Sequence, residues 1–153
     1  MVKNKQNPGS LPSSNSHISF NFIDVKPFLR NKQELRRWIA LCIKEERKSF
    51  GVISFNFCSD NHLLEMNREF LNHNYYTDII TFDFTENNLI SGDIYISKGR
   101  VKENAAELKE MFHVELKRVM IHGILHLCGY KDKSKTEKEK MRKKEDVCLS
   151  LLR

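Results

Sequence analysis

Alternating apolar and polar positions predict four strands. Ile18–Phe22 and Ile53–Phe57 both place single polar residues between apolar ones, as a strand with one buried face does. Thr77–Phe84 is rich in β-branched and aromatic residues, which favour strands, and Gly92–Ile96 has the same character. The link between these last two strands is short, which favours an antiparallel pair.

Apolar positions spaced three and four residues apart predict about five helices in the rest of the chain. The expected helices are Lys32 to Lys48, a short one after Ser59, Ser97 to Met111, one from near Val114, and a last one opened by a Thr136-x-x-Glu139 capping box. Strands and helices mix along the chain. We therefore expect an α+β fold, a small mixed four-stranded sheet packed with helices, with the helix from Val114 in the core.

The chain divides into a tail and one domain. Residues 1–17 are rich in Asn, Ser, Pro and Gly and hold almost no apolar residues. Such a segment cannot bury enough surface to order itself, so we expect a disordered tail or a cloning remnant. Residues 18–153 are long enough for a single domain with its own core, and they contain no internal repeat.

Composition narrows the class of protein. No apolar run approaches the roughly eighteen residues of a membrane span, and the first residues lack the apolar segment of a secretion signal. We therefore expect a cytoplasmic protein without a membrane partner. The net charge of +6 favours a polyanionic partner, nucleic acid first. Much of that charge lies between Lys131 and Lys144, either as a solvated helix face or as a rim that attracts phosphate.

The four cysteines are expected to be free thiols. Cys42, Cys58, Cys128 and Cys148 are scattered, without a CxxC pair, and each lies in or beside an apolar run. A free cysteine in such a place behaves as a small hydrophobe, and a reducing cytosol keeps it reduced. Cys128 is near two histidines, but on a continued helix it would point about 200° away from His126.

Two histidines in the helix from Val114 are the strongest candidates for chemistry. His122 and His126 stand four residues apart, so they lie on one helix face and can hold one metal ion. Gly129 supplies the left-handed position that commonly ends a helix, and Asp132 follows three residues later. Two histidines and one carboxylate, with an open fourth position, make a known catalytic zinc set.

Gly123 separates this motif from the zinc proteases. Those enzymes place a glutamate directly after the first histidine as general base, and this chain has a glycine there. Peptide hydrolysis by that route therefore lacks its base. We hypothesise that Gly123 instead leaves a gap beside the metal that a bulky phosphodiester occupies.

The run from His122 to Tyr130, with Met141 and Glu145 downstream, resembles the signature of the YbeY family of bacterial metal-dependent endoribonucleases. Thr77–Phe82 and Gly92–Ile96 also match that family. The resemblance implies a zinc-binding α+β fold and cleavage of single-stranded RNA. It further implies work on the 3′ end of 16S ribosomal RNA, in ribosome quality control and with the small ribosomal subunit. By this resemblance, His122 and His126 correspond to two metal ligands that are also catalytic residues.

Two positions depart from the family pattern. Asp132 stands where the family usually has a third histidine ligand, and a carboxylate weakens the preference for zinc over iron or manganese. Leu71 stands where many members carry an arginine thought to help cleavage. Arg68, three residues earlier and on the same helix face, is our candidate for the missing catalytic cation, with a plain surface arginine as the alternative.

Weaker candidates and other functions stay open at this point. Tyr75 and Tyr76 either stack on unpaired bases or pack in a loop. Gly92–Ile94 is either an edge strand for extended RNA or only structure. Asp78 lies in or near a strand and either faces the site or, as we expect, lies at the surface, and for His113 we expect a simple polar helix terminus. Besides a zinc-dependent endoribonuclease with one Zn²⁺ per chain, the sequence allows a non-catalytic, metal-stabilised ribosome-assembly factor and a metallopeptidase. It does not predict the oligomeric state.

Overall fold

The computed structural model describes Val2–Lys3 and residues 17–152 of the 153-residue chain. The rest of the predicted tail, residues 1 and 4–16, lies outside the described residues. The described strands are β1 (Val2–Lys3), β2 (His17–Phe22), β3 (Ser49–Cys58), β4 (Ile79–Asp83) and β5 (Leu89–Ser97). They form one mixed sheet in the order β1-β4-β5-β3-β2. The two-residue β1 adds a fifth strand to the four predicted.

Strand pairing places β5 inside the sheet. It runs antiparallel to β4, as predicted, and parallel to β3 on its other side, while β2 is parallel to β3. The possibility that Gly92–Ile94 is an exposed edge strand is therefore wrong. Both edges of β5 are already hydrogen-bonded, so no extended RNA can pair with its backbone.

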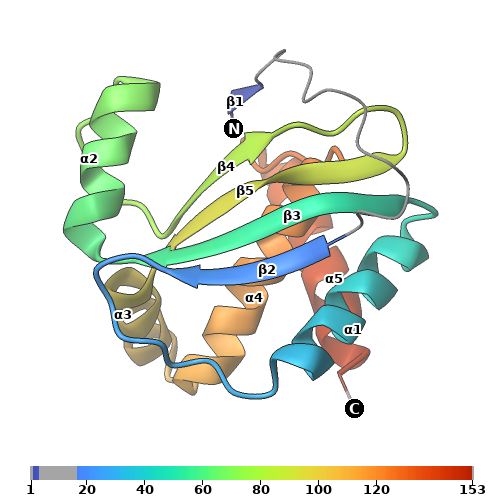
Figure 1. The fold of residues 1–153 in the computed structure, drawn as a ribbon, viewed down its shortest axis with the longest axis horizontal. Coiled ribbons are helices and arrows are strands. Elements are labelled where there is room, and N and C mark those ends of the chain that lie inside the picture. Colours follow the sequence, from blue (N-terminus) through green and yellow to red (C-terminus); the bar gives the residue numbers. More distant parts are fainter. Residues whose placement is uncertain (1, 4–16, 153) are drawn as a thin grey trace.

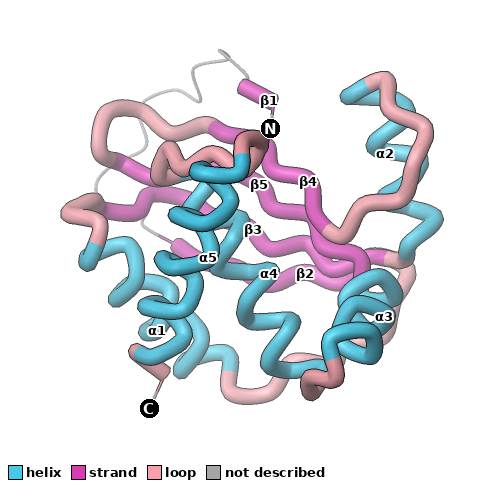
Figure 2. Tube along the Cα trace, turned by 180° about the vertical axis from the view of Figure 1, so that it is seen from behind, coloured by secondary structure: helices cyan, strands magenta, loops and turns pink. Residues whose placement is uncertain are grey.

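Five helices accompany the sheet in the described part of the chain: α1 (Lys32–Glu45), α2 (Asp60–Leu71), α3 (Lys98–Leu108), α4 (Phe112–Leu127) and α5 (Lys135–Ser150). Four of them, α1, α3, α4 and α5, lie on one face of the sheet, with α4 in the middle (Figures 1 and 2). Leu63 of α2 packs instead with Cys58 and Ile80 in a separate cluster. The predicted α+β class is confirmed.

Three serines begin helices. The backbone N–H of His62 donates to Ser59 Oγ, and that of Arg100 donates to Ser97 Oγ, which confirms both predicted caps. The predicted box at Thr136 is wrong by two residues. Ser134 caps α5, and it exchanges hydrogen bonds with Glu137 in both directions. The sequence offers both boxes, and α5 begins early enough to use the first.

The core lies between the sheet and its helix-covered face. Ile53, Phe55 and Phe57 alternate along β3 and are fully buried. Helix α4 is buried on several sides, because it packs on β4, β5, α1, α3 and α5. None of the helices in the described residues is long and apolar enough to span a membrane.

Gly123 lies where α4 packs tightly on the sheet. A Cβ atom on this residue would lie 2.9 Å from Cδ1 of Ile79 and 3.0 Å from Cγ2 of Ile94. Such contacts are too tight for ordinary packing. The hypothesis that Gly123 leaves a gap for substrate is therefore wrong: the space beside it is filled by two isoleucines, and the glycine has a packing role.

Replacing Gly123 with alanine is expected to destabilise the fold by up to about 2 kcal/mol, since overpacking costs about 1–3 kcal/mol and the gain in helix propensity returns about 1 kcal/mol. Gly99, in the first turn of α3, is a matched control, because its Cβ would meet nothing nearer than Asp60 Cβ at 3.8 Å. Gly99→Ala should leave stability unchanged or raise it slightly. Urea unfolding of both variants checks this, and equal midpoints would contradict the packing role.

Candidate metal centre

The end of α4 is shaped so that the chain returns to its own histidines. Gly129, with φ +105°, donates to the carbonyl of His126, and Tyr130 N–H donates to the carbonyl of Leu125. These two bonds form a Schellman cap, in which a glycine turns the chain out of the helix. The predicted turn at Gly129 is confirmed, and it brings Asp132 back to the face that carries His122 and His126.

Three candidate ligand atoms converge. His122 Nε2 and His126 Nε2 are 3.0 Å apart, and Asp132 Oδ2 lies 3.1 Å from the first and 3.2 Å from the second. These residues form a group that could hold a metal ion in the described part of the chain. Ligand atoms bound to one tetrahedral zinc at about 2.0–2.1 Å are about 3.3 Å apart, so the spacing fits such an ion.

The outer nitrogen of each imidazole is fixed by an acceptor. His122 Nδ1 lies 2.8 Å from Glu145 Oε2, and His126 Nδ1 lies 2.9 Å from the carbonyl oxygen of Tyr130. Carbonyl and ionised carboxylate oxygens can only accept hydrogen bonds, so each Nδ1 carries the hydrogen. Each Nε2 lone pair is then directed at the meeting point with Asp132. This is the arrangement that orients histidine ligands in metal sites.

The donor set requires a positive charge at its centre. Two nitrogen lone pairs and a carboxylate oxygen repel one another at about 3 Å unless a cation lies between them. Imidazole nitrogen and carboxylate oxygen both bind zinc, and both also suit iron and manganese. The residues present therefore fit a divalent transition metal, and the metal's identity is a separate question.

The neighbouring charges and burial shift the pKa values of the two histidines in opposite directions. Burial disfavours the charged form of His122, but its bond to Glu145 and the charges of Asp132 and Asp78 outweigh burial and raise its pKa. Burial lowers the pKa of His126, and the neighbouring charge of His122 lowers it further. The two imidazoles therefore differ in basicity, although they lie on the same face of α4.

Glu145, which the sequence indicates only as part of the family signature, contacts His122. Its side chain is 7% exposed, and besides His122 it pairs with Arg118, whose Nη1 lies 3.3 Å from Glu145 Oε1. Arg118 also pairs with Asp146 at 2.9 Å. The signal was available, because Glu145 follows Met141 by four residues and precedes Cys148 by three, on the buried face of α5.

Two clefts adjoin the histidines. One, of about 310 Å³, is lined by His122, by three cations and by four carboxylates: Arg118, Lys138 and Arg142, and Asp78, Glu115, Asp132 and Glu145. The other, of about 290 Å³, is also lined by His122 and Asp132, together with His126 and the loop residues His73, Tyr75 and Thr77. We call them the basic cleft and the aromatic cleft. They meet at the metal centre.

Asp78 lies in both clefts, contrary to the surface position expected for it. Burial raises its pKa, against the opposing charge of His122, and Asn104 Nδ2 donates to its Oδ2 at 3.2 Å. Glu115, in the basic cleft, is 6% exposed, and burial raises its pKa against the charge of Arg118. It lies seven residues before His122, on the same face of α4, which is how sequence could have found it.

The remaining candidates divide between the site and the surface. Leu71, at the end of α2, lines the aromatic cleft. Arg68 lines neither cleft: it pairs with Glu65 at 2.8 Å, and its Nε donates to Asn74 at 2.6 Å. His113 is exposed in the first turn of α4. All four cysteines are free thiols, as predicted, and Cys128 is not part of the ligand group.

This α+β domain brings together two histidines of one helix and a carboxylate from the following turn. Such a site is that of a metal-dependent hydrolase. A family model described as "Endoribonuclease YbeY" matches residues 21–153. The chain belongs to the YbeY family of endoribonucleases, as its signature predicted.

Curated relatives cover almost the whole domain. "Endoribonuclease YbeY" of Flavobacterium psychrophilum is 51% identical over 135 residues, which are 88% of this chain and 95% of that one. "Endoribonuclease YbeY" of Cytophaga hutchinsonii is 52% identical over 129 residues, covering 84% and 90%. The solution structure of TM1509 from Thermotoga maritima is similar, with a TM-score of 0.56, 28% identity, and 88% and 90% of the two chains covered.

Purified protein is expected to carry about one divalent metal ion per chain, and His126→Ala and Asp132→Ala should each lose it, because two ligands rarely suffice. Glu145→Gln should weaken metal binding about 10–100-fold, since it removes the charge that orients His122. Elemental analysis and competition with a chelator measure both effects.

Glu139→Gln, an exposed position on the same helix, is the matched control and should bind metal normally. Metal retained by Asp132→Ala would mean that the third ligand lies elsewhere.

Proposed function

We propose that this chain binds one Zn²⁺ through His122, His126 and Asp132 and hydrolyses single-stranded RNA. The observation that carries the proposal is the convergence of these ligand atoms within 3.2 Å where the basic and aromatic clefts meet. When bound, the zinc would lower the pKa of a water molecule and polarise a phosphate oxygen.

The two clefts divide the work of binding RNA. Lys138 and Arg142 in the basic cleft offer charge to backbone phosphates. On the aromatic side, the rings of His73 and Tyr75 stack with their centroids 5.1 Å apart, and Tyr75 is 57% exposed. Buried Asn67 donates to the carbonyl of Tyr75 at 2.8 Å and holds this loop in place. An unpaired base could stack there, whereas a base within a duplex could not.

Asp78 is the candidate for proton transfer. It lies in both clefts with His122, and its raised pKa makes it a stronger base towards an attacking water than an ordinary carboxylate is. Asn104 donates to Asp78 Oδ2 and so helps to hold the carboxylate in place. In this role Asp78 would be the general base, which in zinc proteases is the glutamate at the position of Gly123.

Two groups of residues are candidates for the cation that contacts the phosphate. Arg68 stays a prediction: to reach a phosphate in the aromatic cleft it would have to leave Asn74 and Glu65. Lys138 and Arg142 already line the basic cleft. Leu71, at the position of the family's arginine, contributes only an apolar wall. We therefore propose that Lys138 and Arg142 make most of the charged contacts with phosphate.

The biological setting extends the same proposal. The family resemblance points to maturation of the 3′ end of 16S ribosomal RNA and to ribosome quality control on the small subunit. RNA of that kind is long and polyanionic, which suits the net charge of +6. Work on such a substrate would place the protein in the cytoplasm.

His122→Ala is expected to abolish cleavage of a single-stranded RNA oligonucleotide, because it removes both a ligand and the contact with Glu145. The same sequence annealed into a duplex should be cut far more slowly by the wild-type protein. His113→Ala, an exposed histidine of the same helix, is the matched control and should keep full activity. Gel analysis of end-labelled RNA measures the rates.

The assay separates the alternatives. RNA that binds but is never cut, by protein shown to contain metal, would favour the non-catalytic assembly factor. Cleavage that survives His122→Ala would mean a contaminating nuclease or a different site. Turnover of a peptide library would favour the metallopeptidase.

Tyr75→Ala is expected to raise KM for single-stranded RNA about tenfold with little change in kcat, since stacking on one base contributes about 1–3 kcal/mol. Tyr75→Phe keeps the ring and loses only the hydroxyl bonded to His73, so it should behave like wild type. Both variants should hold metal normally. Equal KM values for the alanine and phenylalanine variants would contradict the stacking role.

A further inference from the structure

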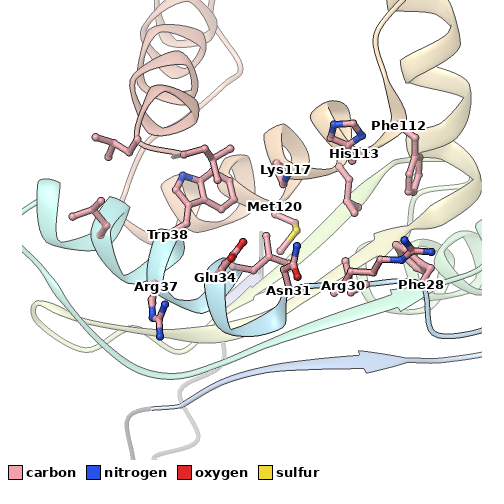
Figure 3. A pocket seen from close by; sticks show the side chains of 16 residues that line it. Phe28, Arg30, Asn31, Glu34, Arg37, Trp38, Phe112, His113, Lys117 and Met120 are labelled. Carbon is pink, nitrogen blue, oxygen red and sulfur yellow. The ribbon is translucent and has the colours of Figure 1, made fainter.

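A cavity of about 740 Å³ lies on the opposite side of α4 from the metal centre. It opens between α1, the start of α4, the segment before α1 and the residues that follow α5 (Figure 3). None of the residues that line it lines the basic or the aromatic cleft. Its volume is in the range of sites for small organic molecules, which is about 300–1,000 Å³.

The walls of this cavity are apolar and firmly packed. Leu35, Trp38, Leu116 and Met120 line it although each is at most 6% exposed. Figure 3 shows Trp38 on one side, Phe112 on the other and Met120 between them. Trp38 is held by a 2.7 Å hydrogen bond from its Nε1 to the carbonyl of Cys148. The concave surface is therefore preformed and suits an apolar body.

The rim is basic. Arg30, Arg37 and Lys117 line the cavity, and Glu34 is the only carboxylate among its described residues. No ion pair joins any of these three cations to a carboxylate within the described chain, whereas Arg68, Arg100 and Arg118 all have such partners. Lys117 is half-buried, so an anion beside it would be partly shielded from water.

We propose that this cavity binds a small anionic amphipath: an apolar body that fills the space beside Trp38, and one carboxylate, sulfate or phosphate that pairs with Lys117. Excess positive charge on the rim selects against neutral and cationic analogues. A single pocket of this volume suits a compact molecule rather than a protein surface. The proposal is independent of the nuclease activity, because the two sites share no lining residue.

The experiment uses the full chain and its single tryptophan as reporter. Dodecanoate is the probe, with dodecanol and dodecyltrimethylammonium as neutral and cationic analogues of equal chain length. Dodecanoate should change Trp38 emission saturably with one site per chain, at least tenfold more tightly than either analogue. Titrations stay below the concentrations at which these compounds form micelles.

Lys117→Glu should weaken dodecanoate binding at least tenfold. Lys102→Glu is the matched control: it makes the same charge change at an exposed position on α3 and should bind like wild type. Circular dichroism verifies that both variants fold. Absence of a saturable change, equal affinity for the three compounds, or equal affinity of the two variants would each overturn the proposal.

Discussion

Helix α4 meets the sheet through a glycine, and this close approach is the constraint on which the rest of the structure depends. Side chains of Ile79 and Ile94 occupy the place where a residue other than glycine would put its Cβ. With the helix axis held there, the direction of every other side chain of α4 is set by the helical repeat. The positions of His122 and His126 relative to β4 therefore follow from the packing, before any metal is considered.

Charge balance is the second determinant of the site. Asp132, Glu145, Asp78 and Glu115 gather around two imidazoles, and the partly buried Arg118 pairs with Glu145. The pKa values of Asp78 and Glu115 are raised by burial, and that of His122 is raised by Glu145 and the neighbouring carboxylates, so the cluster favours protonated groups. A divalent ion would displace protons from this cluster, which couples metal affinity to pH.

Local features of the fold and of the site were predictable from sequence, and features set by contacts between distant segments were not. The period of apolar residues predicts the helices, and His122 and His126 share a face for the same geometric reason. Strand order is different: nothing within Gly92–Ile96 indicates that β3, some forty residues earlier, covers its second edge. The role of Gly123 was misread because sequence does not tell which side of a buried helix meets the sheet. The position of Asp78, directly before β4, also depends on tertiary packing that sequence does not show. Ser134 and Thr136 present equivalent capping patterns, so the start of α5 was misplaced by two residues.

Three stripes of α4 then serve three purposes. Glu115, Val119 and His122 face the clefts, Gly123 meets the sheet, and Leu116 with Met120 lines the cavity on the other side. Met120 and His122 are about 200° apart around the helix, so a molecule in the cavity cannot touch the ligand atoms. It could act on them only by moving α4, and close packing against β4 and β5 resists that motion. A rigid central helix can thus carry an apolar cavity and a metal centre whose chemistries remain separate.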